Sequence, residues 1–489
     1  MHQESSRTSY REKSFRGKDL TGYDFGFADI RGTDFSNAIL TNANFSHVRT
    51  GLKKQWVFIL SLGIVIVSIL AGSLSAYAGA AIGDFLLSKP PSQITVSLGA
   101  IIGSTIFVFV VFAVFLVVII RQGLGGDLGK FAVITAAVVG ILISLLGADI
   151  SRTIILFDLV IISIGIAGSL LGALALAVSI FIFGTYSVIF LVLCISFGAF
   201  LGTWETISFY LEIGGSWVEF LAVACLISVP LIGLSFYIGW KSVSENKKYS
   251  LIKSIAVHFC SLGGTSFRGA NLIDADFNQA MLPYADFRKA NLKRVSWFQS
   301  SKLEFAQVKG TYLEDVSIRH LVVSRKSQEQ VYDDKNLRGL NLRAANLSGA
   351  SFIGADLSEA NLEGANLARA KLVKAKLYST NLSYSCLTGA CIQDWAISTD
   401  TRLEDIDCAF VFMRSPTQDN PDPWRKPDNR NEVFQKGDFT DFIAPIIKTL
   451  DLYRQQNLDP RQITIALKSL DLITTAALIL RLQLLPSSN

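Results

Sequence analysis

The sequence predicts an α-helical transmembrane bundle inserted beside a repeat solenoid, followed by a short helical C-terminal cap. Three observations lead to this fold class. Only 17% of the 489 residues are charged, whereas about a quarter are charged in soluble domains. Uncharged stretches gather between about Trp56 and Trp240. On both polar flanks of that block, large apolar residues recur at a spacing of five.

The apolar block contains six candidate spans, since a membrane-spanning helix needs about 20 mostly apolar residues. The third is short, and no clear polar break divides 154–201, so four spans are the alternative. Lys and Arg gather near both ends of the block, which places both flanks on the cytoplasmic side of an inner, plasma or thylakoid membrane. The candidate spans are Trp56–Ala78, Thr95–Ile120, Phe131–Leu146, Val160–Ile182, Tyr186–Leu201 and Trp217–Gly239.

Asp158 is the candidate intramembrane polar residue. An ionisable group within hydrocarbon is costly and is by default a functional hypothesis. Asp158 lies near the end of a span, however, so two interpretations stay open: a solvated interfacial carboxylate, or a coupling site in a transporter.

The polar flanks repeat every five residues, a spacing that fits neither a helix of period 3.6 nor an alternating strand. After the second group below, the spacing slips by one residue through Leu303, Val308, Leu313 and Ile318, and an interruption follows at about 324–334. The N-terminal centres are Phe15, Leu20, Phe25, Ile30, Phe35, Leu40 and Phe45. Those after the block are Phe267, Leu272, Phe277, Leu282, Phe287, Leu292 and Trp297, and then Leu337, Leu342, Leu347, Phe352, Leu357, Leu362, Leu367, Leu372, Leu377, Leu382, Leu387 and Ile392.

Many repeats have a small residue two places before the centre and Asp or Asn one place before it, as in Ala355-Asp356-Leu357 and Ala360-Asn361-Leu362. This pattern resembles the pentapeptide-repeat family of cyanobacteria. The resemblance implies an all-β right-handed quadrilateral β-helix in which four pentapeptides make one coil, with coils about 4.8 Å apart. Departures from the pattern at Lys18, Tyr23 and Pro283-Tyr284 predict irregular coils there.

The N-terminal repeats make fewer than two coils, too few to bury their own faces. They alternate aromatic and aliphatic centres, as do the repeats from Phe267 to Trp297. We therefore predict that the N-terminal coils stack on the start of the later solenoid; an independently disordered arm is the alternative.

The predicted domains are N-terminal coils (1–50), a transmembrane bundle (51–245), a solenoid (262–397) broken near 324–334, and a C-terminal region (398–489). Leu387–Trp395 together with Phe434–Phe439 resembles the cap of cyanobacterial pentapeptide-repeat proteins. A loop rich in Pro and Asn lies between those segments, and two amphipathic helical stretches follow, at about 442–456 and 460–482.

Function is predicted to be non-enzymatic, because the four His residues are isolated and no catalytic, cofactor or metal motif occurs. The mild net charge of +5 gives no argument for nucleic acid, and a rod that is not acidic argues against DNA mimicry. We expect a membrane-anchored scaffold whose rigid cytoplasmic rod binds a protein partner or a second copy, with membrane lipids around its bundle. The layout resembles that of cyanobacterial membrane proteins that localise the heterocyst glycolipid layer, which suggests envelope organisation. The alternative is a small-solute transporter or channel with a regulatory pentapeptide domain.

Overall fold

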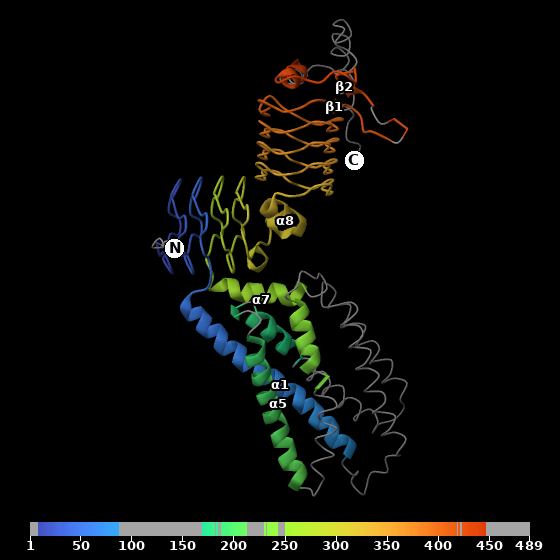
Figure 1. Cartoon of the computed structure of the whole chain (residues 1–489). Helices are drawn as coiled ribbons and strands as arrows, with labels where there is room; N and C mark the ends of the chain where they lie inside the picture. The colour runs from blue at the N-terminus through green and yellow to red at the C-terminus, as the bar shows by residue number, and fades with distance from the viewer. Residues whose placement is uncertain are drawn as a thin grey trace, which may run out of the picture. The chain divides into compact units, whose positions relative to one another are not determined.

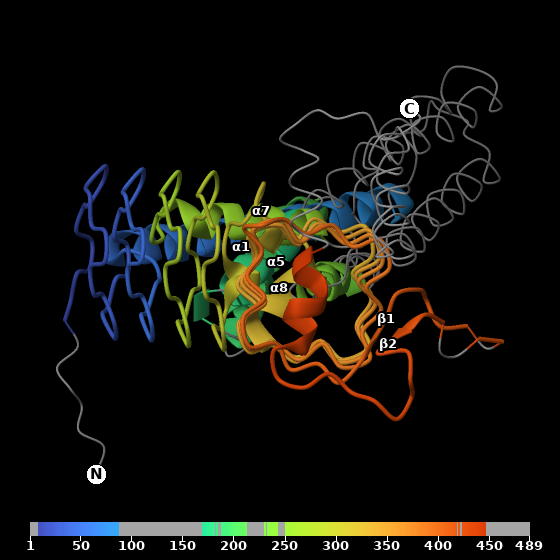
Figure 2. The ribbon, with the colours of Figure 1, turned by 90° about the horizontal axis from the view of Figure 1, so that it is seen from above.

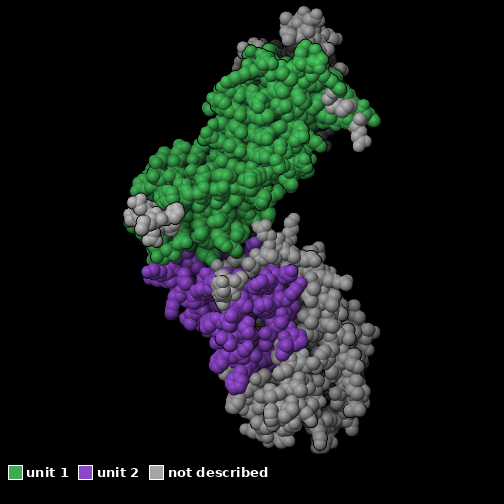
Figure 3. Space-filling model, viewed as in Figure 1, with its two compact units in different colours: residues 1–51, 264–489 green, residues 52–263 purple. Residues whose placement is uncertain are grey.

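The computed structural model describes residues 8–87, 169–180, 182–183, 187–212, 229–230, 232–242, 250–417, 419–420 and 423–445. The chain divides into two compact units, shown in green and purple in Figure 3. Unit 1 comprises residues 1–51 and 264–489, and unit 2 comprises residues 52–263.

Unit 1 is a solenoid in which four repeats make one coil. The five positions of a repeat are named i−2 to i+2 around the central apolar residue, i. Parallel bridges join each i−1 residue to its counterpart four repeats later, as in Ser9 with Asp29 and Asn341 with Asn361. Four five-residue sides therefore close one coil, and Figure 2 shows the later coils end-on as a four-sided outline. This arrangement confirms the β-helix that the repeat pattern implied.

The N-terminal coils are continuous with the coils that follow unit 2. Asp34 pairs with Ser266 and Asn44 pairs with Asp276 in the same parallel ladder. The sequence separation of Asp34 and Ser266 equals one coil of four repeats plus the whole of unit 2. The predicted stacking of the two segments is therefore correct, and we call the coils 8–51 and 264–301 the first stack.

Two ladders of aromatic rings fill the first stack. Aromatic centres recur at every second repeat, which places them on two opposite sides of the four-sided coil. Within a ladder the rings stack, as for Phe35 and Phe267, whose centroids are 5.2 Å apart with planes 4° from parallel. Rings of opposite ladders meet edge to face, which is a favoured aromatic geometry. The ladders are Phe15–Phe35–Phe267–Phe287 and Phe25–Phe45–Phe277–Trp297.

The solenoid is irregular between 302 and 325, where one residue, Gln307, still pairs with Asp286 in the ladder, so the predicted break near 324–334 is wrong. This segment forms two short 3₁₀ turns, Leu303–Phe305 and Tyr312–Glu314, and the helix α8, Val316–Ser324 (Figure 1). Regular bridges resume at Lys326. Ser327 and Tyr332, which are 3% exposed, occupy central positions normally held by Leu or Phe and hydrogen-bond to each other, so the sequence pattern disappears although the coil continues.

The second stack runs from Lys326 to Phe412, beyond the end that the sequence predicted at residue 397. One extra residue between Ala396 and Arg402 shifts the register, after which the ladder resumes. The strand β1, Val411–Phe412, then pairs antiparallel with β2, Arg425–Lys426. A helical segment at 438–445 places Phe439 and Ile443 in the core. Most residues of the two predicted helices, 442–456 and 460–482, lie outside the described residues.

The coils predicted to be irregular at Lys18, Tyr23 and Pro283-Tyr284 are regular. Pro283 stands at i+1, the turn position that suits its fixed φ. Tyr284 stands at i+2 with a φ of +61°, as other residues of this column do. Lys18 and Tyr23 stand at i−2 in the first coil, where both are exposed. The coil therefore tolerates changes at these positions that a strict pattern match treats as defects.

Unit 2 is helical where it is described. Its longest helices are α1, Lys54–Leu87, and α5, Ser187–Glu212, and α7, Ser250–Leu262, leads back to the solenoid. α1 and α5 approach closely, because a Cβ added to Gly72 would lie 2.1 Å from the carbonyl oxygen of Ile195. Among the described residues one stretch, Lys54–Ala76, is long and apolar enough to cross a membrane, and three apolar helices are shorter. A multi-span bundle thus stays a prediction; the second and third candidate spans and Asp158 lie outside the described residues.

Candidate interaction surface

The i−1 position of the repeats serves the local turn. The side chain there accepts a hydrogen bond from the backbone N–H two residues later, as in Asp24 Oδ1 with Gly26 N at 2.8 Å and Asn366 Oδ1 with Ala368 N at 3.0 Å. Asp and Asn favour this turn because their short side chains reach the backbone. The Asp and Asn of the motif are therefore structural, and their frequency gives no evidence of a metal or acidic binding site.

The i+2 position has a positive φ along both stacks. Glycine fits there without strain, as at Gly354 with a φ of +68°. Other residues cost about 1 kcal/mol in this region, yet Lys289, Lys374 and Tyr384 stand there with φ between +55° and +61°. Tyr384 is 61% exposed. The side chains at these corners project outward and are candidates for contacts.

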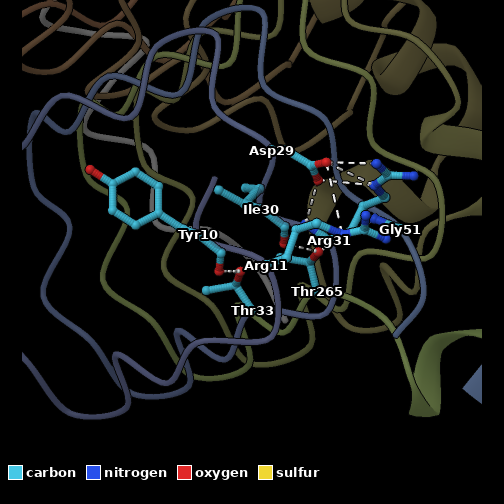
Figure 4. A network of polar contacts seen from close by, with 8 residues as sticks. All are labelled: Tyr10, Arg11, Asp29, Ile30, Arg31, Thr33, Gly51 and Thr265. Carbon is cyan, nitrogen blue, oxygen red and sulfur yellow. Dashed lines mark hydrogen bonds and ion pairs between the residues drawn. The ribbon is translucent and has the colours of Figure 1, made fainter. Parts of the chain in front are cut away.

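Inward threonines keep the register of the coils. Thr33 Oγ1 donates to the carbonyl oxygen of Tyr10 at 2.8 Å, and Thr265 Oγ1 donates to that of Ile30 at the same distance (Figure 4). Both threonines replace the usual alanine at i−2 and are fully buried. The bond made by Thr265 crosses the point where unit 2 is inserted, so the coil there has the same geometry as an uninterrupted coil.

Unit 2 is inserted into a single turn of the first stack. Gly51 and Gly264 occupy consecutive turn positions of the same coil, which we call the insertion corner. A Cβ on Gly264 would lie 1.9 Å from the carbonyl oxygen of Tyr284, and a Cβ on Gly51 would lie 2.9 Å from Cγ of Arg31. Close backbone approach therefore requires glycine on the return side of the corner.

Asp29 organises the surface next to this corner. Its carboxylate accepts hydrogen bonds from Nε and Nη2 of Arg31, at 2.9 and 2.6 Å, and lies 3.9 Å from Arg11 (Figure 4). Burial opposes the charged form, but the hydrogen bonds and charges of the two arginines prevail and lower the pKa of Asp29. This surface holds ordered, paired charge.

The two stacks are joined by direct contacts. Trp297 Nε1 donates to Tyr312 Oη at 2.8 Å, and Tyr312 Oη donates to the carbonyl oxygen of Leu292 at 3.1 Å. Glu359 of the second stack accepts ion pairs from Lys293 of the first and from Arg338. Burial raises the pKa of Tyr312 well above its ordinary value, so this network stays protonated and intact at neutral pH.

A band of unpaired positive charge follows three sides of one coil of the second stack. The coil 366–385 contains no acidic residue, and its four bases make no ion pair in the described structure. All four are exposed and lie at outward positions on three neighbouring sides. We call this set the basic belt: Arg369, Lys371, Lys374 and Lys376.

The predicted repeat centres are buried along both stacks, except that Phe15 and Leu20 in the first coil are partly buried. The sequence reasoning missed the basic belt because it followed the inward positions. The signal was present as four bases at spacings of two, three and two residues, in a coil without Asp or Glu.

The described residues offer no evident reactive centre. No group of three His, Cys, Asp or Glu residues among them could hold a metal ion. Burial raises the pKa of the Cys408 thiol to about 12 and also raises that of Cys391, so these thiols are poor nucleophiles. Outward side chains thus carry the functional argument.

Comparison with known families settles the nature of the repeats. The family model for pentapeptide repeats matches in eight copies, over residues 19–49, 260–296, 336–372 and 355–394. The chain thus contains pentapeptide repeats in both parts of the solenoid. Comparison with curated proteins gives no match.

Among solved structures, the chain is similar to several pentapeptide-repeat proteins, including the following three. Rfr23 from the cyanobacterium Cyanothece 51142 is 24% identical with a TM-score of 0.13, over 29% of this chain and 63% of that one. HetL from Nostoc sp. strain PCC 7120, involved in heterocyst differentiation regulation, is 24% identical with a TM-score of 0.13, over 30% and 60%. A protein from the Arabidopsis thaliana thylakoid lumen is 24% identical with a TM-score of 0.12, over 28% and 72%. The chain therefore spans about three fifths of the length of the first two.

Proposed function

We propose that this protein is a non-enzymatic, membrane-anchored scaffold whose solenoid, on the cytoplasmic side, binds a protein partner in envelope organisation. The observation that carries the proposal is the insertion of unit 2 into one turn of a continuous solenoid. Both ends of unit 2 are built into the same coil at Gly51 and Gly264, so an anchor in unit 2 would hold the solenoid at two adjacent backbone positions.

Exposed apolar side chains on unit 2 support a membrane anchor. On α1 the residues Phe58, Leu62, Ile66 and Leu70 are 50% to 70% exposed and follow one another at a spacing of four, which places them along one face of the helix. On α5 Ile189, Leu193 and Phe197 are 54% to 72% exposed with the same spacing. Large contiguous apolar surfaces of this kind are rare on soluble monomers and suit a lipid environment.

The basic belt supports a protein partner with an acidic surface. Complementary charge raises the rate of encounter and selects the partner. The belt stands on a rigid coil, because both neighbouring coils bond to it through Ser351, Asp356, Cys391 and Ala396. A rigid surface loses little conformational entropy when it binds.

Membrane anchoring is tested by floating the full chain with liposomes and by extraction at alkaline pH. We expect the protein to float and to resist extraction. A protein that stays in the dense fraction, or that alkali releases, would refute the anchor.

Partner binding is tested by quantitative capture from native membranes with wild type and the belt variant R369Q/K371Q/K374Q/K376Q. The matched control, R16Q/R49Q/R268Q/K289Q, removes the same charge from exposed, unpaired bases of the first stack. We expect one salt-sensitive partner that the belt variant loses and the control keeps. Equal capture by both variants would refute the role of the belt.

A further inference from the structure

The first stack carries its free positive charge on two adjacent sides of the coil. In the coils among residues 8–301, four Arg or Lys side chains make neither an ion pair nor an aromatic contact in the described structure. All four are exposed. The others are paired or lie over rings, as Arg288 pairs with Asp286 at 2.7 Å and Arg294 with Asp274 at 2.6 Å. The four free bases are Arg16, Arg49, Arg268 and Lys289.

All four free bases lie on the two sides of the coil that meet at the insertion corner. Arg49 stands on the side whose centres are Ile30 and Thr50, two residues before Gly51. The other three stand on the side whose centres are Phe35 and Phe267, which begins directly after Gly264. The opposite side, with centres Phe25, Phe45, Phe277 and Trp297, carries Asp24 and Asp276 and no Lys or Arg. The distribution of free charge therefore follows the insertion corner.

Chain connectivity limits how far this corner can be from a bilayer anchored by unit 2. Gly51 precedes Lys54, the first residue of α1, by three residues, and an extended chain spans at most about 3.6 Å per residue. On the return side Gly264 follows Leu262, the last residue of α7, by two residues. The corner is thus within about 11 Å of the start of α1 by covalent geometry alone, which is comparable with the Debye length at physiological salt.

We propose that Arg16, Arg49, Arg268 and Lys289 form a binding surface for the anionic headgroups of membrane lipids. The inference rests on the proposed membrane anchor and adds a lipid class to it. Positive side chains near a bilayer are attracted to anionic lipids within a Debye length of the surface. None of the four bases makes an ion pair in the described structure. Asp29 and Asp286, on the same two sides, are held by other arginines, and Asp34, on the side of Phe35, accepts the backbone N–H of Ser36.

The backbone at Lys289 makes a test variant available. It stands at i+2 with a φ of +60°, in the same column as Gly17 and Gly269, whose φ values are +67° and +69°. A glycine would remove the strain that a lysine carries there.

The test uses the full chain reconstituted into nanodiscs that contain phosphatidylcholine with a minority of phosphatidylglycerol. Spin-labelled lipids report how strongly phosphatidylglycerol associates with the protein relative to phosphatidylcholine. We expect wild type to prefer phosphatidylglycerol. In the variant R16Q/R49Q/R268Q/K289Q this preference should fall at least about fivefold at low salt, because each base near the membrane surface contributes a factor of about five. The belt variant, which loses the same charge, should keep the wild-type preference.

Lys289→Gly separates binding from folding. It should melt at or above the wild-type temperature because it relieves strain, and still lower the preference for phosphatidylglycerol. Inorganic phosphate at matched ionic strength should not reduce the preference; competition by phosphate would show a general anion site and overturn the assignment to lipid.

The possible failures are distinguishable. A chain that does not float with liposomes refutes the anchor. A chain that floats but shows equal association with both lipids, or a preference that the belt variant loses equally, overturns this inference and leaves the anchor in place.

Discussion

The stacked rings of Phe35 and Phe267 allow the coupling energy between the coils on the two sides of unit 2 to be measured directly. Both side chains are fully buried, and their ring centroids are 5.2 Å apart with nearly parallel planes. We propose a double-mutant cycle with Phe35→Leu and Phe267→Leu, since leucine occupies the same central position in other coils. Each single change removes a ring from a packed core and should cost about 1 to 3 kcal/mol.

The coupling energy is the informative quantity. Stacked aromatic pairs are worth about 0.5 to 1.5 kcal/mol beyond the area they bury, so the double variant should be less destabilised than the sum of the single variants by that amount. Amide hydrogen exchange of residues 265–282, in the full chain, reports the opening free energy of the coil that contains Phe267.

Phe352 supplies the control. It is fully buried in the second stack, and its ring stacks on that of Tyr332, so the pair Phe35 and Phe352 should show coupling below about 0.5 kcal/mol. Coupling between Phe35 and Phe267 no larger than in this control pair would refute the reasoning, because it would mean that the coils on the two sides of unit 2 do not share one core.

Three further predictions concern single positions. Ser385→Ala should stabilise the solenoid by about 1 kcal/mol, because the buried Ser385 hydroxyl has no hydrogen-bond partner and such a group is costly; a lower melting temperature would contradict this. Gly264→Ala should prevent correct closure of the insertion corner and increase proteolysis there, whereas Gly364→Ala, with open space around its Cβ, should cost only about 1 kcal/mol; equal effects would exclude the steric argument. At Asp315 burial alone would raise the pKa, but bonds from Lys335 and from the start of α8 lower it to about 2, below about 3.9 in the unfolded chain. Its contribution, about 1 kcal/mol after discounting for solvent exposure, is complete above about pH 5 and lost as the pH falls towards 2; an acid melting curve of Asp315→Asn that parallels wild type would contradict this.

The inward-facing residues of the solenoid were predictable, because one large apolar residue every five positions identifies the residue that each side of a packed four-sided coil turns inward. The break was placed wrongly for a physical reason. Leu303, Leu313 and Ile318 keep the spacing of five and are buried, although they belong to 3₁₀ turns and α8. Val308, between them, still follows a ladder residue, whereas the regular coil at Ser327 lacks an apolar centre. Periodicity reports burial and leaves the backbone conformation open.

The candidate surfaces were less predictable, because outward residues obey no packing rule. Which bases are free depends on pairs between coils, such as Arg294 with Asp274, and on the side of the coil where each falls. The side of the coil on which each base falls follows from the four-repeat register, once that register is known to continue across unit 2. The insertion of the whole of unit 2 between two successive sides concealed that register in the sequence.

The insertion of unit 2 in one turn also sets the order in which the molecule can be assembled. The coil of Phe45 needs the coil of Phe277 above it, and all of unit 2, from Leu52 to Gly263, must be synthesised between them. At about 5 to 20 residues per second this takes about 10 to 40 seconds, during which the N-terminal coils have an open edge and no upper neighbour. Completion of the first stack therefore comes only after all of unit 2 has been made, so a closed solenoid reports that the whole inserted segment has been synthesised.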